Sequence, residues 1–420
     1  MRHGKHRLTS VLGVLLAGFL ALGTAACAPS LTATELTADI KPASETSVSV
    51  PDQVGRTTYD FSLDLLRACV KEDAKESVLV SPLSVLNALA LAENGAAGET
   101  LAQIEQATDL SADELTDALQ TYAQLVADDE SPLSLANSIW LRDTDELSVH
   151  ESFLEACGGQ LGAQVFTAPF DSSTVSDINA WISDRTHGMI PEIVSEIPPS
   201  TMLYLINALA FEGTWADPFD EALIEEDTFT CEDGTEQSAS MMHSTESSYL
   251  ENDQAEGFIK PYESFYSFVG LLPKEGVSVG ELLEGLDGGG LSELLTPVDY
   301  TVAQIGLPRF SFAYDNELTD ELSALGVTDA FDPERADFSR MGTCESGPFS
   351  VGMVLHKTYI DVNEGGTRAA AVTGIGMVGS IAPANEPEVR AVILDRPFVY
   401  LIVDQRTGTP AFIGTVMDME

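Results

Sequence analysis

Two neighbouring stretches near the carboxyl end hold residue types whose spacing could do chemistry. Residues 374–379 read GIGMVG, which matches the G-x-G-x-x-G pattern that lets a backbone approach a pyrophosphate. Such a site also needs a strand before the glycines and a helix after them. The residues that follow, SIAPANEPEVR, contain Pro383 and Pro387 and do not open a helix. We therefore expect no dinucleotide site here, and no cofactor.

The sequence lacks the other common catalytic signatures. It contains no P-loop, no G-x-S-x-G elbow and no H-E-x-x-H helix, and its histidines form no ligand pair. His356 lies on a predicted buried strand, where a hydrogen bond within the core explains it. No pair of carboxylates stands out as an acid and a base among the 67 acidic residues. We expect neither catalytic residues nor a metal site, and we do not interpret the protein as an enzyme.

Charge limits the possible partners. The 420 residues include 67 Asp and Glu but only 20 Lys and Arg, which gives a net charge of −47. Such a surface repels phosphate backbones and anionic lipid headgroups, so we expect no nucleic-acid partner. The same acidity argues against a heparin-binding helix.

The amino end predicts export. Three basic residues precede an apolar run at 8–22, which is short for a transmembrane helix and typical of a signal peptide over residues 1–26. Cys27 follows two alanines and resembles the lipid-modified cysteine of a bacterial lipobox, although Thr24 stands where that pattern prefers Leu. Ordinary cleavage near Ala26 is the alternative. We expect a chain anchored to the outer side of the cell membrane by a lipid on Cys27, or a secreted chain.

The remaining cysteines are Cys69, Cys157, Cys231 and Cys344. They are widely scattered, contain no C-x-x-C pair and have no histidine at metal spacing. In an exported protein they allow one or two disulfides, and buried free thiols are the alternative.

Composition divides the rest of the chain into a tether and one domain. Residues 27–52 are rich in Thr, Ser, Ala and Pro without a sustained period, which predicts a flexible tether. No second linker of this kind follows, so we expect a single domain over 53–420. The patterned segments are helical periods at 81–108 and at 175–190, the latter ending at Gly188, strand runs at 200–213 and 351–364, and a hairpin at 396–418. Helices and strands that neither alternate nor separate predict an α+β fold.

The region around GIGMVG closely resembles the hinge and reactive loop of the serpins, a family of serine proteinase inhibitors. The family pattern H-K-x-x-x-x-x-(D/N)-E-x-G-T-E-A-A-A is met by His356-Lys357 and then by Asn363-Glu364-Gly365-Gly366-Thr367-Arg368-Ala369-Ala370-Ala371. Arg368 is the one departure, since the family has Glu there. SPLS at 81–84, NALAFEGTWADPF at 207–219 and the closing DRPFVYLIVDQRTGTPAFIG also have serpin counterparts, so the resemblance covers about 55–418.

The resemblance implies a fold and a mechanism. Serpins have a large mixed or antiparallel central sheet, two smaller sheets, about nine helices and an exposed reactive-centre loop, here about 364–390. The protease cleaves this loop, becomes acylated, and the loop inserts into the central sheet as a new strand. We expect a monomer that traps serine proteases in this way. The alternative is a non-inhibitory serpin that acts as a surface binding or carrier module.

Loop composition agrees with insertion. A strand inserted in the middle of a sheet needs small or apolar residues on its inward face and no proline. No proline occurs from Glu364 to Ala382, and Arg368 falls on the outward face with Ala370. The inward face carries Thr367, Ala369, Ala371, Thr373, Ile375 and Met377.

Family geometry places the cleaved bond 17 residues into the loop, counted from Glu364, which gives Ser380-Ile381. The alternatives, if the count slips, are Met377, Val378 and Gly379. Fully extended, 17 residues span about 56 Å. No Lys or Arg occurs from 369 to 389, so we expect elastase- or subtilisin-like targets, whose pockets take a small or apolar residue.

The resemblance also assigns supporting residues to two regions that control the opening of the central sheet. The shutter is a buried hydrogen-bonded cluster, and the breach is the end of the sheet where the loop enters. The shutter set is Ser81, Ser84, Asn207 and His356, and the breach set is Trp215 and Lys357.

Overall fold

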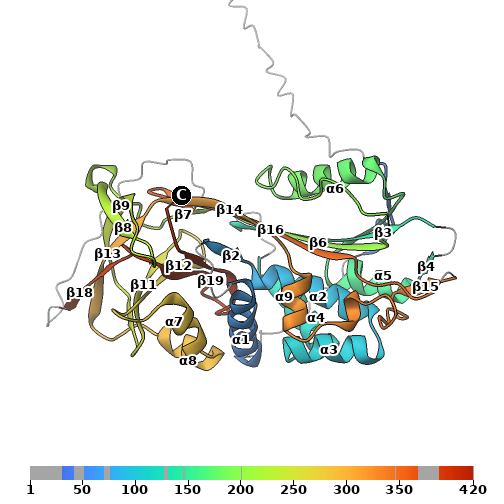
Figure 1. Cartoon of the computed structure of the whole chain (residues 1–420), viewed down its shortest axis with the longest axis horizontal. Helices are drawn as coiled ribbons and strands as arrows, with labels where there is room; N and C mark the ends of the chain where they lie inside the picture. Colours follow the sequence, from blue (N-terminus) through green and yellow to red (C-terminus); the bar gives the residue numbers. More distant parts are fainter. Residues whose placement is uncertain are drawn as a thin grey trace, which may run out of the picture.

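An eight-stranded sheet, called sheet A below, extends along the long axis of the molecule (Figure 1). The computed structural model describes residues 31–41, 52–70, 76–126, 131–144, 147–199, 201–345, 347–367 and 387–419. The strands of sheet A follow the order β1-β5-β3-β6-β16-β17-β7, and β14 pairs with the other side of β16. Their bounds are β1 Thr34–Glu35, β3 Leu133–Arg142, β5 Gln164–Ala168, β6 Leu203–Phe211, β7 Gly213–Thr214, β14 Phe310–Glu317, β16 Met353–Asn363 and β17 Gly366–Thr367.

Two smaller sheets and a ribbon complete the strands of the described part. The six-stranded sheet consists of β10 Tyr249–Glu251, β11 Ala255–Pro261, β12 Tyr266–Pro273, β19 Phe398–Asp404, β20 Pro410–Val416 and β2 Val78–Val80. The four-stranded sheet consists of β18 Glu388–Ile393, β13 Thr301–Pro308, β9 Glu236–Glu246 and β8 Glu225–Thr230. The ribbon pairs β4 Leu147–Val149 with β15 Gly342–Cys344. The predicted hairpin at the carboxyl end is confirmed, since β19 and β20 pair antiparallel.

Nine α-helices occur among the described residues. They are α1 Asp52–Cys69, α2 Pro82–Gly95, α3 Gly98–Thr108, α4 Ala112–Val126, α5 Glu151–Leu154, α6 Ser172–Arg185, α7 Val279–Gly285, α8 Gly288–Leu294 and α9 Thr319–Ala324. The predicted break at Gly95 separates α2 from α3. Helix α6 ends three residues before the expected Gly188, at Arg185. With these helices and mixed sheets, the predicted α+β class and serpin-type architecture are confirmed.

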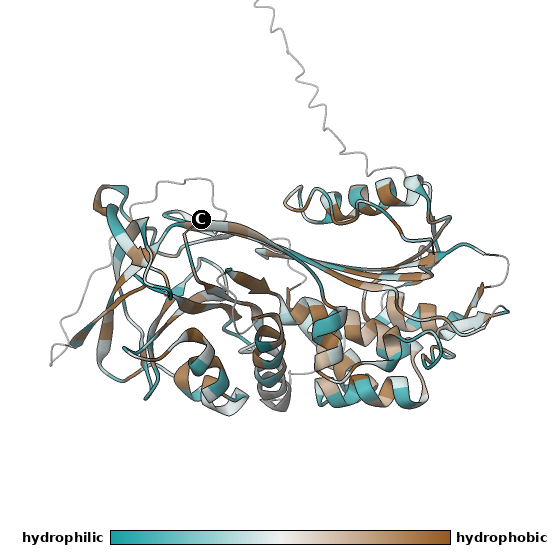
Figure 2. Ribbon diagram, in the orientation of Figure 1, coloured by the Kyte–Doolittle hydropathy of each residue, from teal (hydrophilic) through white to brown (hydrophobic). Residues whose placement is uncertain are grey.

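Helices cover both faces of sheet A. Helix α6 crosses one face, where Ile178, Trp181 and Ile182 pack against Trp140 and Tyr204 of the strands (Figure 1). Helix α2 lies on the other side and is buried along almost its whole length. Figure 2 shows the apolar strands β2 and β19 next to the helices on this side. Sheet A is therefore an inner layer of the molecule, with helices packed on both of its faces.

Residues 31–41 correct one expectation. We predicted a flexible tether over 27–52, but Thr34–Glu35 forms β1, an antiparallel edge strand beside β5. The Asp177 carboxylate of α6 accepts from the backbone N–H of Thr32 (2.9 Å), from the Thr32 hydroxyl (2.6 Å) and from the N–H of Ala33 (2.8 Å). Leu31 and Ala33 pack on the α6 side of the sheet. We call residues 31–41 the strap, because it ties α6 to the outer edge of sheet A.

The leader and Cys27 lie outside the described residues, so export and lipid attachment stay predictions. Among the described residues, no helix is both long and apolar enough to cross a membrane.

The strap contacts generate a first prediction. Asp177→Ala removes three hydrogen bonds to a charged acceptor, and we expect about 2 kcal/mol of lost stability. Thermal unfolding of the full chain followed by circular dichroism measures the loss. Asp184→Ala, an exposed acidic residue of the same helix, is the control and should leave the melting temperature unchanged. Equal melting temperatures for Asp177→Ala and the parent chain would contradict the role of the strap.

A buried carboxyl in α2 generates a second prediction. Burial, reinforced by nearby Glu105, raises the pKa of Glu93 from about 4.5 to about 8, and its Oε2 atom has no partner. The folded state therefore holds a proton that the unfolded chain releases, and the stability falls as the pH rises from about 4.5 to about 8. Glu93→Gln removes this effect, so the variant should gain more over the parent at pH 8.5 than at pH 5. Melting curves at both pH values test this, and an equal gain at both would refute it.

Candidate functional site

The centre of sheet A is incompletely paired. Strands β6 and β16 run parallel and pair over only four residues, Tyr204–Asn207 beside Met353–His356. On its other side β16 pairs with β14 along its length, from Leu355 to Val362. Within the described strands, β6 and β16 have no pairing to each other beyond Asn207 and His356. The two strands therefore part from this point toward their carboxyl ends.

The four predicted shutter residues meet where the strands part. The backbone N–H of Ser81 donates to His356 Nε2 at 3.2 Å, and the Ser81 hydroxyl donates to the carbonyl of Ala411 at 2.8 Å. The Ser81 oxygen also accepts from the N–H of Ser84 at 3.1 Å and so caps α2, while the Ser84 hydroxyl bonds Asn207. All four side chains are buried. The cluster links α2 to both strands and to β20.

Two further amides extend the cluster. Asn207 donates to Asn137 of β3, and Asn137 donates to Asn87 of α2 at 3.0 Å. Sequence reasoning missed both, although each is an asparagine in an otherwise apolar segment, which was an available signal. Burial lowers the pKa of His356 to about 4, so its ring is neutral at pH 7 and its Nε2 can accept. At pH 7 the cluster therefore contains no charged side chain. We call these six residues the polar junction.

Strand β7 follows β6 after the single residue Glu212. At the open end of the sheet, the start of the hinge lies between β16 and β7. Gly366 and Thr367 form β17, which pairs antiparallel with Val362 and Asn363 of β16 on one side and with β7 on the other. Gly366 has φ +155°, and a Cβ there would meet the backbone of β7, so only glycine fits. Thr367 is buried, and its hydroxyl lies 2.6 Å from that of Tyr262.

An aromatic cluster supports this end of the sheet. Trp215 is fully buried, its indole N–H donates to the carbonyl of Asn363 at 2.8 Å, and its backbone N–H donates to Gly365 at 3.0 Å. The Trp215 ring stacks on Tyr262 with 4.4 Å between centroids. Trp215 therefore lies at the end of sheet A where β16 passes into the hinge, and its role at the breach stays a prediction.

Lys357 does not belong to this group. Its ammonium pairs with Asp315 of β14 at 2.8 Å, next to the shutter. Six residues separate it from Asn363 along an extended strand, or about 20 Å. The cation that pairs with the first hinge residue is Arg309, which lies 2.6 Å from the Glu364 carboxylate. We predicted Lys357 at the breach, but the strand register places it near the shutter end of β16. The sequence motif does not specify which end of the strand a residue occupies.

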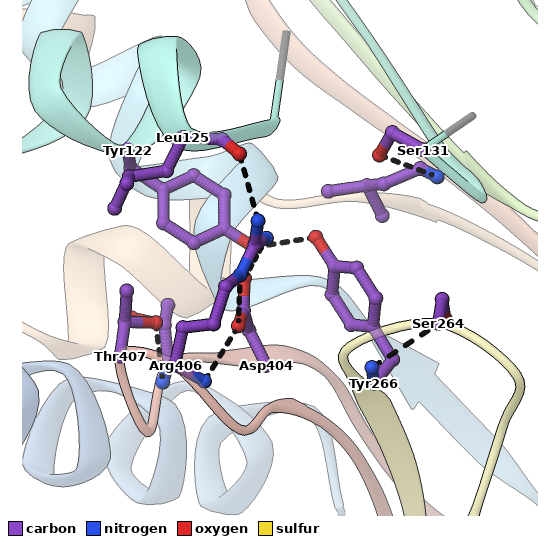
Figure 3. A network of polar contacts seen from close by, with 10 residues as sticks. Tyr122, Leu125, Ser131, Ser264, Tyr266, Asp404, Arg406 and Thr407 are labelled. Atoms are coloured by element: carbon purple, nitrogen blue, oxygen red, sulfur yellow. Dashed lines mark hydrogen bonds and ion pairs between the residues drawn. The ribbon is translucent and has the colours of Figure 1, made fainter. Parts of the chain in front are cut away.

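A cavity of about 580 Å³ lies near this end, lined by residues of α4, β3, β7, the turn before β12 and Arg406. Figure 3 shows the polar network in its wall. The Arg406 guanidinium donates twice to Asp404, at 3.0 and 2.6 Å, and to the carbonyl of Leu125 at 2.7 Å. The hydroxyls of Tyr122 and Tyr266 are 2.9 Å apart, and burial raises the pKa of both. These groups are mutually satisfied, so the network joins α4 to the six-stranded sheet and offers no reactive group.

The described residues offer little else for chemistry. They contain no group of three or more His, Cys, Asp or Glu side chains that could hold a metal ion. Cys157 is a free thiol that is fully buried, and burial raises its pKa, so it is not a nucleophile. The arrangement suits a change of strand pairing better than a covalent reaction of its own side chains.

Part of the predicted site lies outside the described residues. This applies to Arg368, Ala369, Ala370 and Ala371 of the hinge, and to Met377, Val378, Gly379, Ser380 and Ile381 around the expected bond. Their roles stay predictions. The described ends of the loop region are Thr367 in sheet A and Pro387 before β18.

Comparison with known proteins agrees with the architecture. The family model described as "Serpin (serine protease inhibitor)" matches residues 56–419. A serine protease inhibitor of Cyanea capillata is 32% identical over 372 residues, which are 85% of this chain and 96% of that protein. An uncharacterized serpin-like protein of Thermococcus kodakarensis is 31% identical, over 85% of this chain and 84% of that one.

Solved structures give the same answer. The thermophilic serpin tengpin in its native state superimposes with a TM-score of 0.85 at 39% identity, covering 92% of this chain and 99% of that chain. Tengpin in its latent state gives 0.76 at 36% identity, covering 90% and 100%. The parted strands of sheet A, the polar junction and the hinge residues between β16 and β7 have now been described. The chain that carries them belongs to the serpin family.

Proposed function

We propose that this serpin inhibits serine proteases of elastase or subtilisin type by a suicide mechanism. The protease attacks the Ser380-Ile381 bond, or a bond at one of the neighbouring alternatives, and becomes acylated. The freed loop then inserts into sheet A and carries the acyl-enzyme with it. The observation that carries this proposal is the position of β17, which already occupies the first two places of a strand between β16 and β7.

The strand register supports the proposal. Continuing the pairing of Thr367 with Val362 and Gly213 places Thr373 opposite both His356 and Asn207. These two residues are themselves paired in the closed part of the sheet, so both flanking strands give the same register. Insertion through residue 376 would separate the four parallel pairs and replace them by antiparallel neighbours on both sides. Antiparallel pairing is slightly more stable per residue, which favours the inserted state.

The residues along this register are compatible with insertion. Thr367 is buried, so every second residue after it shares its inward face. Ala369 would lie between Ile360 and Phe211, both of which are buried. Thr373 would bring a hydroxyl to the shutter cluster, where polar partners are present.

The same register offers a reason for Arg at position 368, where the family pattern has Glu. In the same register its side chain lies on the outward face between Asp361 of β16 and Glu212 beside β7. Both carboxylates lie on the accessible face of the sheet. The cation that departs from the family pattern therefore meets two anions on insertion, where the usual Glu would be repelled.

The direct test is incubation with elastase, subtilisin and trypsin, followed by a denaturing gel. We expect elastase or subtilisin to give an SDS-stable complex and a released peptide that begins at Ile381. Trypsin should give no complex, because no Lys or Arg lies near the bond. Clean loop cleavage without any complex would instead support the non-inhibitory carrier function.

A matched pair of variants separates trapping from cleavage. Ala369→Glu buries a charge between Ile360 and Phe211 and should convert the inhibitor to a substrate. Ala370→Glu puts the same charge on the outward face, beside the partly exposed Tyr359, and should still form the complex. Complex formation by both variants, or by neither, would contradict the register.

A separate prediction concerns Arg368→Glu. Two attractions become two repulsions on a solvent-exposed face, a change of about 1 kcal/mol, or roughly fivefold in the partition between trapping and release. We expect the stoichiometry of inhibition to rise accordingly, and less so at high salt. Adding Asp361→Arg to this variant should restore trapping. A double variant no better than Arg368→Glu alone would rule out this pairing.

A further inference from the structure

Tyr300 is an exposed aromatic residue in a strained backbone conformation. It precedes β13, its side chain is 83% exposed, and its φ is +55°. A bulky residue in the left-handed region is uncommon, because its Cβ crowds the following carbonyl. A glycine would remove the strain, and the exposed ring adds nothing to the core. A strained residue that does not stabilise the fold is a candidate for binding another molecule.

The backbone on both sides of Tyr300 is held in place. Its carbonyl accepts from the N–H of Glu388 at 2.8 Å, and the N–H of Val298 donates to the carbonyl of Tyr249 at 2.8 Å. Val298 and Val389 are also large apolar residues counted as exposed, Val389 at 53%. The two valines are neighbours of Tyr300 through the chain and through its hydrogen bond to β18, so three exposed apolar residues gather around a backbone that is held in place. We call Val298, Tyr300 and Val389 the aromatic patch.

The aromatic patch lies where the reactive loop rejoins the fold. Strand β18 begins at Glu388, pairs parallel with β13, and lies beside it at one end of the molecule (Figure 1). From Ile381 to Pro387 there are seven residues, so the expected bond lies within about 24 Å of Glu388. A protease of some 240 residues has a radius of gyration near 18 Å. A body of this size, held at that bond, is large enough to reach the patch.

The size of the contact argues for the same occupant. Protease–inhibitor interfaces bury about 800 Å² on each partner, or roughly 20–30 residues a side, so residues near the loop are expected to take part. Tyrosine is among the residues that dominate binding at such interfaces. Asp299 and Glu388 are both exposed, and the Glu388 carboxylate pairs with Arg390 at 2.8 Å. The matching protease surface would therefore be largely apolar.

We infer that the aromatic patch is a docking surface for the body of the serine protease engaged by the loop, and that Tyr300 is its main specificity-determining residue. The inference rests on the proposed function, since it takes the loop as the bait. Tyr300 acts on the encounter and the docked complex. It has no part in loop insertion.

The test compares association rates of elastase and subtilisin with the full chain and its variants. Tyr300→Gly should slow association by about fivefold or more. It should leave the stoichiometry of inhibition unchanged, and its melting temperature should be equal to or above that of the parent, because strain is removed. Tyr300→Phe should keep the rate. Phe265→Ala, which removes a 63% exposed ring at another turn, is the matched control and should also keep it.

The outcomes distinguish the two ideas. If the parent chain is only cleaved, the trapping function fails, and a slower cleavage of Tyr300→Gly still supports the docking surface. Equal rates for Tyr300→Gly and the parent, in trapping or in cleavage, overturn the inference. So does an equal loss with Phe265→Ala. If neither protease cleaves or binds the parent chain, both ideas fail.

Discussion

The parting of β6 from β16 is the constraint on which the rest of the structure depends. A strand edge inside a sheet carries backbone N–H and carbonyl groups that require partners. Here two such edges face each other beyond Asn207 and His356, with two residues of β17 between them at the far end. An interior gap of this kind has the geometry for one more strand of the right length. The fold is therefore arranged around a position that another part of the chain can fill.

The polar junction at the closed end suits this arrangement better than an apolar one. The Ser81 hydroxyl caps α2 by accepting from the N–H of Ser84 and donates to Ala411 of β20, so one side chain links two elements. Asn207 bonds both Ser84 and Asn137. Buried hydrogen bonds are strong when satisfied, but they can exchange partners when a new polar group arrives. Tightly interdigitated apolar side chains would resist separation and would have to be repacked.

The outer edge of the same sheet is treated in the opposite way. There β1 covers β5, and Asp177 holds the strap to α6 through three hydrogen bonds. A long uncovered edge invites pairing with other chains, and β1 replaces it by an edge strand of only two residues. The strap also fastens the helix that lies over the strands. Sheet A therefore ends in a short, tied-down strand at this edge, while its central strands are parted.

Local patterns in the sequence were sufficient for much of this. Apolar periods predicted α2, α3, β6 and the hairpin of β19 and β20, because each depends on neighbours along the chain. The loop motif, with its family resemblance, predicted the hinge and the shutter residues, and the structure brings the four shutter residues together. Tertiary structure alone decided the strap, the position of Lys357, and the partners Asn137 and Arg309. Each of these depends on register between segments that are distant in sequence, and a residue's type and local spacing do not specify which distant strand it will face.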